Sequence, residues 1–356
     1  MHSDASLEWL DQPVAPIDSR AAEAARQRQA QLTKPPGSLG RLETLAEQFA
    51  GWQGQVRPAL ERIRLCVFAA DHGIAARGVS AFPQAVTAQM VNNFCRGGAA
   101  VSVLGERCDA DFRVINLGCV VPPQPHPRLI DRTLNQAAGQ QGTADFSEAA
   151  AMTEEQLSLA LAAGREQVDD EQTIQLFIGG EMGIGNTTSA SALAAALLGL
   201  DAGRVVGRGT GIDGETLERK RELIDYALAL HRVNTTQPLQ ALRCLGGFEI
   251  AALVGAYVRC AQRGIPVLVD GFISTAAALV ACRLCPPVRS WLLFAHQSTE
   301  PGHRLMLKFL EAQPLLSLEM RLGEGSGAAL AVPLLQSALA LHSQMATFSE
   351  AGVSDA

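Results

Sequence analysis

The stretch IGGEMGIGNTTSASAL, from Ile178 to Leu193, decides the fold, because an apolar run leads into it and a helical pattern follows it. Four glycines fall within the seven positions from Gly179 to Gly185, and Glu181 lies among them. Successive backbone N–H groups in a glycine-rich turn before a helix can bind a phosphate. A carboxylate would repel that anion, so we expect Glu181 to face a different part of the ligand.

The same succession of apolar strand, glycine-rich loop and helix recurs along the chain. Strand patterns end in such loops at 63–73, 111–119, 173–181, 265–271 and 290–298, and 315–327 is predicted to add one more short strand. Helical patterns cover about 84–104, 187–198, 214–231, 248–262, 274–282 and 302–312. Continuous apolar strands alternating with helices predict an α/β fold with a parallel, Rossmann-like sheet and helices on both faces. Ligands bind such sheets outside the carboxyl ends of the strands.

Three helical patterns lie outside this alternation. Two fall between residues 15 and 50 and are separated by the turn TKPPGSLGR, and the third covers 326–345. They predict a small helical domain built from both chain ends, residues 1–55 and 326–356. Residues 56–325 would then form a large α/β domain that carries the active-site loops.

Composition excludes several classes of protein. The 356 residues have a formal net charge of -7 and no strongly basic run, which argues against nucleic-acid binding. No apolar run is long enough to span a membrane, and we expect no export signal and a cytoplasmic protein. Eight cysteines are scattered along the chain, and the pair Cys282 and Cys285 lacks the second pair that a zinc site would need. We interpret them as reduced core thiols and expect no metal site.

Five loops combine glycines with polar residues and are candidates for the site: 69–90, 179–189, 207–213, 295–303 and 322–329. They do not match the common phosphate or nucleophile motifs. Thr188 stands where a dinucleotide fingerprint needs its last glycine. Around Ser326, Glu324 and Ala328 occupy the two glycine positions of a nucleophile elbow.

A purely structural interpretation remains open for each of these loops. The turn before residue 187 could be a tight connection with Asn186 or Thr187 as helix cap. His72 and His296 end apolar strands, and such histidines are more often hydrogen-bonded structural residues. The acids Glu181 and Glu324 favour function, because a structural turn has no need of them.

Longer segments of the chain resemble one family, the nicotinate-nucleotide:dimethylbenzimidazole phosphoribosyltransferases of cobalamin lower-ligand synthesis. The matching segments occur in the family's order from about residue 32 to residue 340, which is nearly the whole chain. They are KPPGSLGRLE, AADHGIAARGVSAFPQAVTAQMVNNFCRGGAA, GGEMGIGNTTSASAL, GRGTGID, LGGFEIAALVGA, VDGFISTAAAL, AHQSTEPGH and LGEGSGAAL. Several of them are long and none is a generic motif, so the resemblance is specific.

The resemblance implies a homodimer and a reaction that needs neither metal nor cofactor. Ribose 5-phosphate would pass from nicotinate mononucleotide to 5,6-dimethylbenzimidazole, with inversion at C1′, giving α-ribazole 5′-phosphate and nicotinate. The leaving base is a pyridinium and departs as a neutral ring nitrogen. The incoming base becomes acidic as positive charge develops on it, and a carboxylate within hydrogen-bond reach can take its proton.

The resemblance also assigns roles to individual residues. Glu324 matches the proposed general base and Glu181 a second active-site acid. Ser80 and Gln89 match the benzimidazole pocket. The remaining matches are substrate-binding positions, most of them around the phosphate and ribose: Met182, Gly183, Gly185, Asn186, Thr187, Lys220, Ser298 and Gly323. The chain departs from the family pattern at Asn116, where an acid is expected nearby, and at Phe82, where tyrosine is common.

Two alternatives stay open at this point. The same reaction could use another acceptor, such as adenine or a phenol, because the sequence does not measure the pocket near 80–90. A non-catalytic nucleotide sensor on this scaffold would bind the mononucleotide without turnover. A Rossmann oxidoreductase is disfavoured by the failed fingerprint at Thr188.

Overall fold

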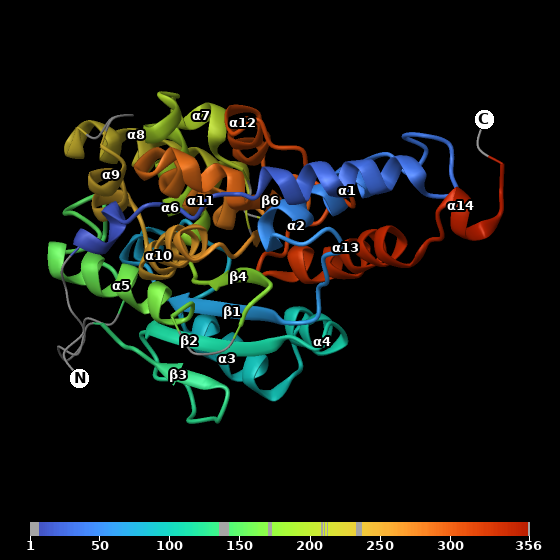
Figure 1. Cartoon of the computed structure of the whole chain (residues 1–356). Coiled ribbons are helices and arrows are strands. Elements are labelled where there is room, and N and C mark those ends of the chain that lie inside the picture. The colour runs from blue at the N-terminus through green and yellow to red at the C-terminus, as the bar shows by residue number, and fades with distance from the viewer. Residues whose placement is uncertain are drawn as a thin grey trace.

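The computed structural model describes residues 7–134, 142–169, 173–207, 209, 211, 213–232 and 237–354. Its centre is a six-stranded sheet in the order β3-β2-β1-β4-β5-β6, in which every pair of neighbours is parallel (Figure 1). The strands are β1 Ile63–Ala70, β2 Asp111–Gly118, β3 Leu129–Asp131, β4 Leu176–Met182, β5 Val267–Val269 and β6 Leu292–Phe294. The predicted parallel, Rossmann-like α/β sheet is confirmed.

The direction of strand succession reverses between β1 and β4. The chain first moves outward from β1 to β2 and β3, and then returns to place β4 on the other side of β1, with Leu65 opposite Ile178. From there it continues to β5 and β6. A reversal of this kind leaves a crevice at the carboxyl ends of the two central strands, which is where open α/β sheets bind ligands.

Helices cover the sheet and account for most of the predicted helical patterns. The helix α10 packs on β1 and β4 with α5 beside it, while α3 and α4 contact β1 and β2. The helices α5 and α10 pack closely, because a Cβ on Gly164 of α5 would collide with the carbonyl oxygen of Ala252 of α10. The bounds are α3 Ala85–Arg96, α4 Ala100–Arg107, α5 Glu154–Glu166, α6 Asn186–Leu198, α7 Ala202–Val205, α8 Gly214–His231, α9 Pro238–Leu245, α10 Phe248–Arg263, α11 Phe272–Leu284 and α12 Pro301–Phe309. Three short 3-10 helices are η1 Glu8–Asp11, η2 Gly73–Arg77 and η3 Pro286–Trp291.

Helices from the N-terminal and C-terminal parts of the chain lie side by side in a lobe that projects from the sheet (Figure 1). It contains α1 Ser19–Gln31, α2 Arg41–Gln53, α13 Ser326–Gln344 and α14 Phe348–Ala351. The side chain of Arg28 on α1 donates to the carbonyl oxygens of His342 and Met345, which ties the two ends together. The predicted turn between the first two helices is confirmed. Residues before α1 pack elsewhere, since Gln262 of α10 donates to the carbonyl of Trp9 at 2.8 Å. The division into domains 1–55 with 326–356 and 56–325 stays a prediction.

Three sequence-based expectations are wrong. The segment 315–327 forms no strand and contributes only an isolated bridge between His296 and Leu316. The strand that completes the six-stranded sheet is instead β3. The helix expected at 84–104 is two helices, α3 and α4. Glu181 lies within β4 and not in a loop.

The strand assignment of Glu181 has a packing reason. A Cβ on Gly180 would collide with the carbonyl oxygen of Glu324, so only glycine allows the 323–325 turn to approach β4. A Cβ on Gly179 would collide with the side chain of Leu253. These two glycines therefore serve close packing, as glycines inside strands often do, and the turn that leads into α6 starts later, at Gly183.

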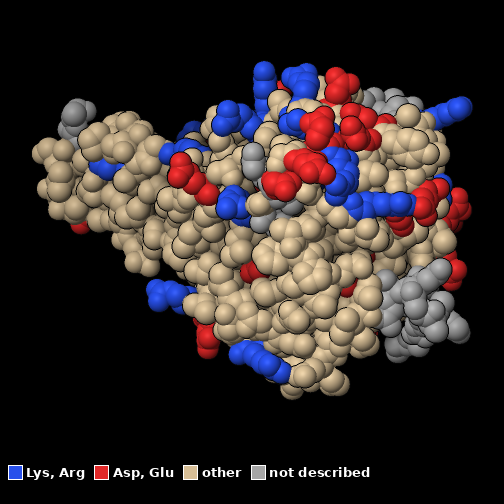
Figure 2. Space-filling view, turned by 180° about the vertical axis from the view of Figure 1, so that it is seen from behind, with Lys and Arg blue, Asp and Glu red and all other residues tan. Residues whose placement is uncertain are grey.

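Charged side chains of both signs are intermingled on the face shown in Figure 2. On α8, for example, Arg219 pairs with Glu215 and Arg221 with Glu218. Such exposed pairs at helical spacing contribute little to stability. In the described part of the chain, no helix is long and apolar enough to cross a membrane.

Candidate active site

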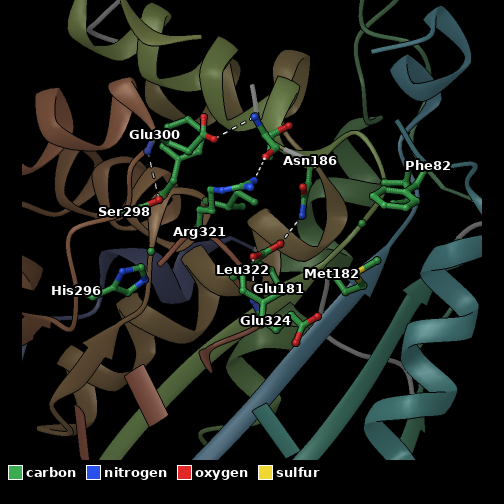
Figure 3. A pocket seen from close by; sticks show the side chains of 18 residues that line it. Phe82, Glu181, Met182, Asn186, His296, Ser298, Glu300, Arg321, Leu322 and Glu324 are labelled. Carbon is green, nitrogen blue, oxygen red and sulfur yellow. Dashed lines mark hydrogen bonds between the residues drawn. The ribbon is translucent and has the colours of Figure 1, made fainter. Parts of the chain in front are cut away.

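A cavity of about 260 Å³ opens at the carboxyl edge of the sheet, beside the reversal between β1 and β4 (Figure 3). Eight of the residues predicted for the site line it: Glu181, Met182, Gly183, Asn186, Thr187, Ser298, Gly323 and Glu324. They come from three sequence segments that are far apart in the chain. The fold thus brings together most of the predicted substrate-binding positions.

Two helices begin at this cavity, each after a glycine-rich turn. The helix α6 follows the turn Gly183–Gly185, and α13 follows the turn Gly323–Gly325. Both N-cap residues are glycines in the left-handed region, with φ of 102° at Gly185 and 91° at Gly325. Neither glycine can cap its helix with a side chain. In α6 the N–H groups of Asn186 and Thr188 donate to the carbonyl oxygens of Gly183 and Gly185.

Glu181 is held firmly at the base of the cavity. One carboxylate oxygen accepts a hydrogen bond from the Asn186 side chain, drawn in Figure 3, and the other accepts from the backbone N–H of Glu324 at 3.4 Å. Burial raises the pKa of Glu181 well above the usual range, and the nearby carboxylates of Glu249 and Asp270 raise it further. Burial and these neighbouring charges both favour the neutral, protonated form over the carboxylate.

Glu324 differs from Glu181 in both backbone and hydrogen bonding. Its φ is 67°, a left-handed conformation that strains any residue with a Cβ. Within the described residues, no hydrogen bond reaches its carboxylate, which lines the cavity. Burial, and secondarily the charge of Asp270, raise the pKa of Glu324 to about 7. A strained acid with a free carboxylate and a near-neutral pKa is a candidate for proton transfer.

Lys220 does not line the cavity itself but contacts Thr187, which does. It projects from α8, is buried, and its Nζ donates to the Thr187 hydroxyl at 2.9 Å. Burial lowers the pKa of Lys220 to about 8, against the opposing effect of the Glu300 carboxylate. Lys220 therefore remains mostly cationic at neutral pH and places positive charge close to the first turn of α6.

The base of the α6 turn is supported by two buried hydrogen-bond chains. Thr87 donates to Asp71 at 2.6 Å and accepts from the backbone N–H of Ile184 at 3.1 Å. His72 lies 2.6 Å from a Glu249 oxygen through Nε2 and 3.0 Å from the Ser189 hydroxyl through Nδ1. These contacts give His72 the structural role that strand-end histidines commonly have.

Four predicted residues do not line the cavity: Gly185 and Lys220, described above, and Ser80 and Gln89. Ser80 accepts a hydrogen bond from the backbone N–H of Phe82 at 3.3 Å, and Phe82 is the residue of that loop that lines the cavity. Gln89 is exposed on α3. The assignment of Ser80 and Gln89 to a benzimidazole pocket stays a prediction.

The sequence interpretation missed other residues of the cavity wall. Glu300 accepts from the backbone N–H of Gly209 at 3.0 Å, and Arg321 donates to the carbonyl of the same glycine at 3.2 Å. Together they fix one rim of the cavity. Glu300 could have been found from its place two residues after Ser298, whereas the pattern around Arg321 suggested a strand and hid it.

His296 also lines the cavity, and its Nε2 lies 3.8 Å from an oxygen of the buried Asp270. Among the described residues, no group of three or more His, Cys, Asp or Glu side chains is arranged to hold a metal ion. The eight cysteines are free thiols, and burial raises the pKa of Cys282 to about 12, which keeps it protonated.

Comparisons with known proteins agree on one family. A family model described as phosphoribosyltransferase matches residues 14–353. Nicotinate-nucleotide–dimethylbenzimidazole phosphoribosyltransferase of Pseudomonas putida KT2440 is 55% identical over 349 residues, or 98% of each chain. The protein of the same name from Xanthomonas campestris pv. campestris 8004 is 56% identical, over 99% of this chain and 100% of that protein.

A solved structure extends this agreement to three dimensions. The crystal structure of nicotinate-nucleotide-dimethylbenzimidazole phosphoribosyltransferase from Thermus thermophilus superposes with a TM-score of 0.86 at 43% identity. It covers 96% of this chain and 100% of that chain. The chain therefore belongs to the nicotinate-nucleotide–dimethylbenzimidazole phosphoribosyltransferase family.

Proposed function

We propose that this protein transfers ribose 5-phosphate from nicotinate mononucleotide to 5,6-dimethylbenzimidazole, in the synthesis of the lower ligand of cobalamin. Family membership supports the reaction. The observation that carries it is the Glu324 carboxylate, which is free, faces the cavity and has a pKa of about 7. A general base with a pKa near the operating pH is the most effective.

The chemistry needs one proton acceptor. One imidazole nitrogen of the incoming base attacks C1′, while the bond from C1′ to the pyridinium nitrogen breaks and its electron pair leaves with nicotinate. The other imidazole nitrogen carries a proton that becomes acidic as charge develops on the ring. Glu324 takes that proton, giving α-ribazole 5′-phosphate with inversion at C1′.

Glu181 has a binding role in this proposal. Its raised pKa favours a neutral carboxylic acid, which can donate a hydrogen bond that a carboxylate cannot. We therefore assign it to a ribose hydroxyl rather than to charge stabilisation of the transition state. A neutral acid would not repel the anion, which supports a phosphate site close to Glu181.

The phosphate belongs at the start of α6. The turn Gly183–Gly185 leaves backbone N–H groups of that helix without side-chain caps, and the cation of Lys220 lies behind Thr187. Helix N-termini with a nearby cation favour phosphate binding. Asn186, Ser298 and Gly323 would contact the ribose, and Met182 with Phe82, Ser80 and Gln89 would form the base pocket.

The direct test is release of nicotinate from nicotinate mononucleotide, with and without 5,6-dimethylbenzimidazole, in the presence of EDTA. We expect release that depends on the benzimidazole and is matched by an α-ribotide product. Adenine and a phenol serve as competing acceptors. Tight binding of the mononucleotide without release would overturn the transferase proposal, and faster release with another acceptor would change its substrate.

We also propose that the protein is a cytoplasmic homodimer with a small helical domain from residues 1–55 and 326–356. The resemblance to the family supports the dimer. The lobe seen in Figure 1 supports the domain division. Light scattering during size-exclusion chromatography measures the mass directly, and a single-chain mass at micromolar concentration would contradict the dimer.

A further inference from the structure

Asp270 follows the end of β5 and has no part in the chemistry proposed above. We propose that Asp270 is a positioning residue, which caps α13 from a neighbouring strand and thereby holds the Glu324 carboxylate at the cavity. The inference rests on the proposed role of Glu324 as general base. In this arrangement the buried Asp270 holds Glu324 in position and also affects how readily Glu324 takes up a proton.

The capping geometry is the first support. One Asp270 oxygen accepts from the backbone N–H of Gly325 at 3.2 Å, and the other accepts from the backbone N–H of Ala328 at 2.8 Å. Ala328 is the third residue of α13, the position that an N-cap side chain usually serves. Gly325 has no side chain for this purpose, so the acceptor comes from β5 instead.

This cap fixes the strained backbone of Glu324 from one side, and Glu181 fixes it from the other. The N–H of Glu324 donates to Glu181 at 3.4 Å, and the next N–H along the chain, that of Gly325, donates to Asp270. A non-glycine residue at φ 67° persists only where its surroundings determine it strongly. Without Asp270 the turn would lose an anchor next to the proposed base.

Charge is the second support. Asp270 is 1% exposed, and the groups around it and Glu324 are Glu181 on β4, Tyr257 on α10 and His296 after β6. The charge of Glu249 on α10 acts on Glu181 as well. Burial raises the pKa of Asp270, while His296 and the backbone N–H groups of α13 lower it. Burial raises the pKa of Glu324 to about 7, and an ionised Asp270 contributes to this rise.

The test is Asp270→Asn, which keeps the size of the side chain but removes its charge and one acceptor oxygen. We expect kcat at its plateau to fall between about 10-fold and 100-fold, because small displacements of a catalytic group have effects of that size. We also expect the acid limb of the kcat profile to move to lower pH by about one unit, because a neighbouring negative charge is gone. A merely structural role would lower the plateau and leave the acid limb in place, and that result would overturn the proposal.

A second readout separates this inference from the reaction itself. The carboxyl carbon of Glu324 can be titrated by carbon-13 NMR and assigned by its loss in Glu324→Gln. Its pKa should be lower in Asp270→Asn than in the wild-type protein, even if the wild-type protein transfers no ribose phosphate. An unchanged pKa of Glu324 would contradict the inference, whereas an inactive wild type would contradict the proposed function.

Two further variants complete the design. Asp270→Glu keeps the charge but displaces the oxygens, so kcat should fall while the acid limb stays at the wild-type pH. If Asp270→Asn does not fold, wild-type kcat in Asp270→Glu would overturn the positioning role. Asp18→Asn is the matched control, because Asp18 caps α1 through the N–H groups of Arg20 and Ala21, in the lobe. It should lower stability and leave the acid limb unchanged.

Discussion

The turns Gly183–Gly185 and Gly323–Gly325 each open a helix at the same cavity. Glu181 lies just before the first turn and Glu324 lies within the second, and the two glutamates are held in opposite ways. Glu181 has a strand backbone, and both of its carboxylate oxygens accept hydrogen bonds from the protein. Glu324 has a strained, left-handed backbone. In the part of the chain that the structure describes, its carboxylate receives no hydrogen bond.

The difference supports the proposed roles, in which Glu181 binds substrate and Glu324 accepts the proton. Both Glu181 oxygens accept hydrogen bonds from the protein, so a substrate that transferred a proton to Glu181 would have to compete with these donors. Among the described residues, the Glu324 carboxylate has no such partners, so it can accept a proton. It lies in a strained turn, and strain of this kind tends to persist at functional sites. The variants below test whether the two acids differ in this way.

The largest expected effect is the loss of Glu324. We expect Glu324→Gln to lower kcat by about 10²–10⁴-fold, which corresponds to roughly 3–5 kcal/mol of barrier. Binding of nicotinate mononucleotide, measured by calorimetry, should change little, since the proposed phosphate site is at the start of α6. Near wild-type turnover in this variant would show that Glu324 is not the general base. The proposed difference in role between Glu324 and Glu181 would then be wrong.

The next effect is the pH dependence of turnover. Glu324 must be deprotonated to accept a proton, so kcat should fall about tenfold per pH unit below its pKa of about 7. Saturating substrates are needed in the assay, because the free phosphate and the free base also titrate. A rate that stays constant down to pH 5 would contradict the near-neutral pKa of Glu324.

The sequence predicted the sheet well because its strands follow a strong physical rule. A strand buried over its whole length, such as β1, is apolar at nearly every position, and this pattern is visible without the structure. Arg64 is the exception in β1, and its charge is paired with Asp111. The strand β3 has only three residues, Leu129–Asp131, which is too short to show any periodicity. The segment 315–327 has a strand-like composition, but its turn at Glu324 packs against β4 and breaks the extended conformation.

The site was predictable where several residues lie together in one motif, and less so where it depends on contacts between segments. The loops around Glu181 and Glu324 were found from their glycines. Asp270 was not singled out, because its role depends on the position of α13 relative to β5, which no local pattern contains. For the same reason, Gly179 and Gly180 were taken for a ligand-binding loop, although they are needed for packing.

A smaller effect is expected for Glu181→Gln. The amide has one acceptor oxygen where the carboxyl group has two, so either Asn186 or the backbone N–H of Glu324 loses its partner. We expect kcat/KM to fall about tenfold, or roughly 1.4 kcal/mol, in steady-state assays. The acid limb near pH 7 should remain in this variant, because Glu324 still causes it. A loss as large as that of Glu324→Gln would show that the two acids share the chemistry.

The smallest effect is on stability and isolates the strain at residue 324. Glu324→Gly should raise the free energy of unfolding by about 0.5–1 kcal/mol, because relief of left-handed strain exceeds the entropy that glycine adds to the unfolded chain. Glu319→Gly is the matched control: Glu319 has φ 56° but is exposed and does not line the cavity. Denaturant titration should show stabilisation of both variants, and only Glu324→Gly should lose turnover. If Glu324→Gly were less stable than the wild type, the Glu324 side chain would be stabilising the turn. The left-handed backbone at residue 324 would then give no evidence that the residue is kept for function.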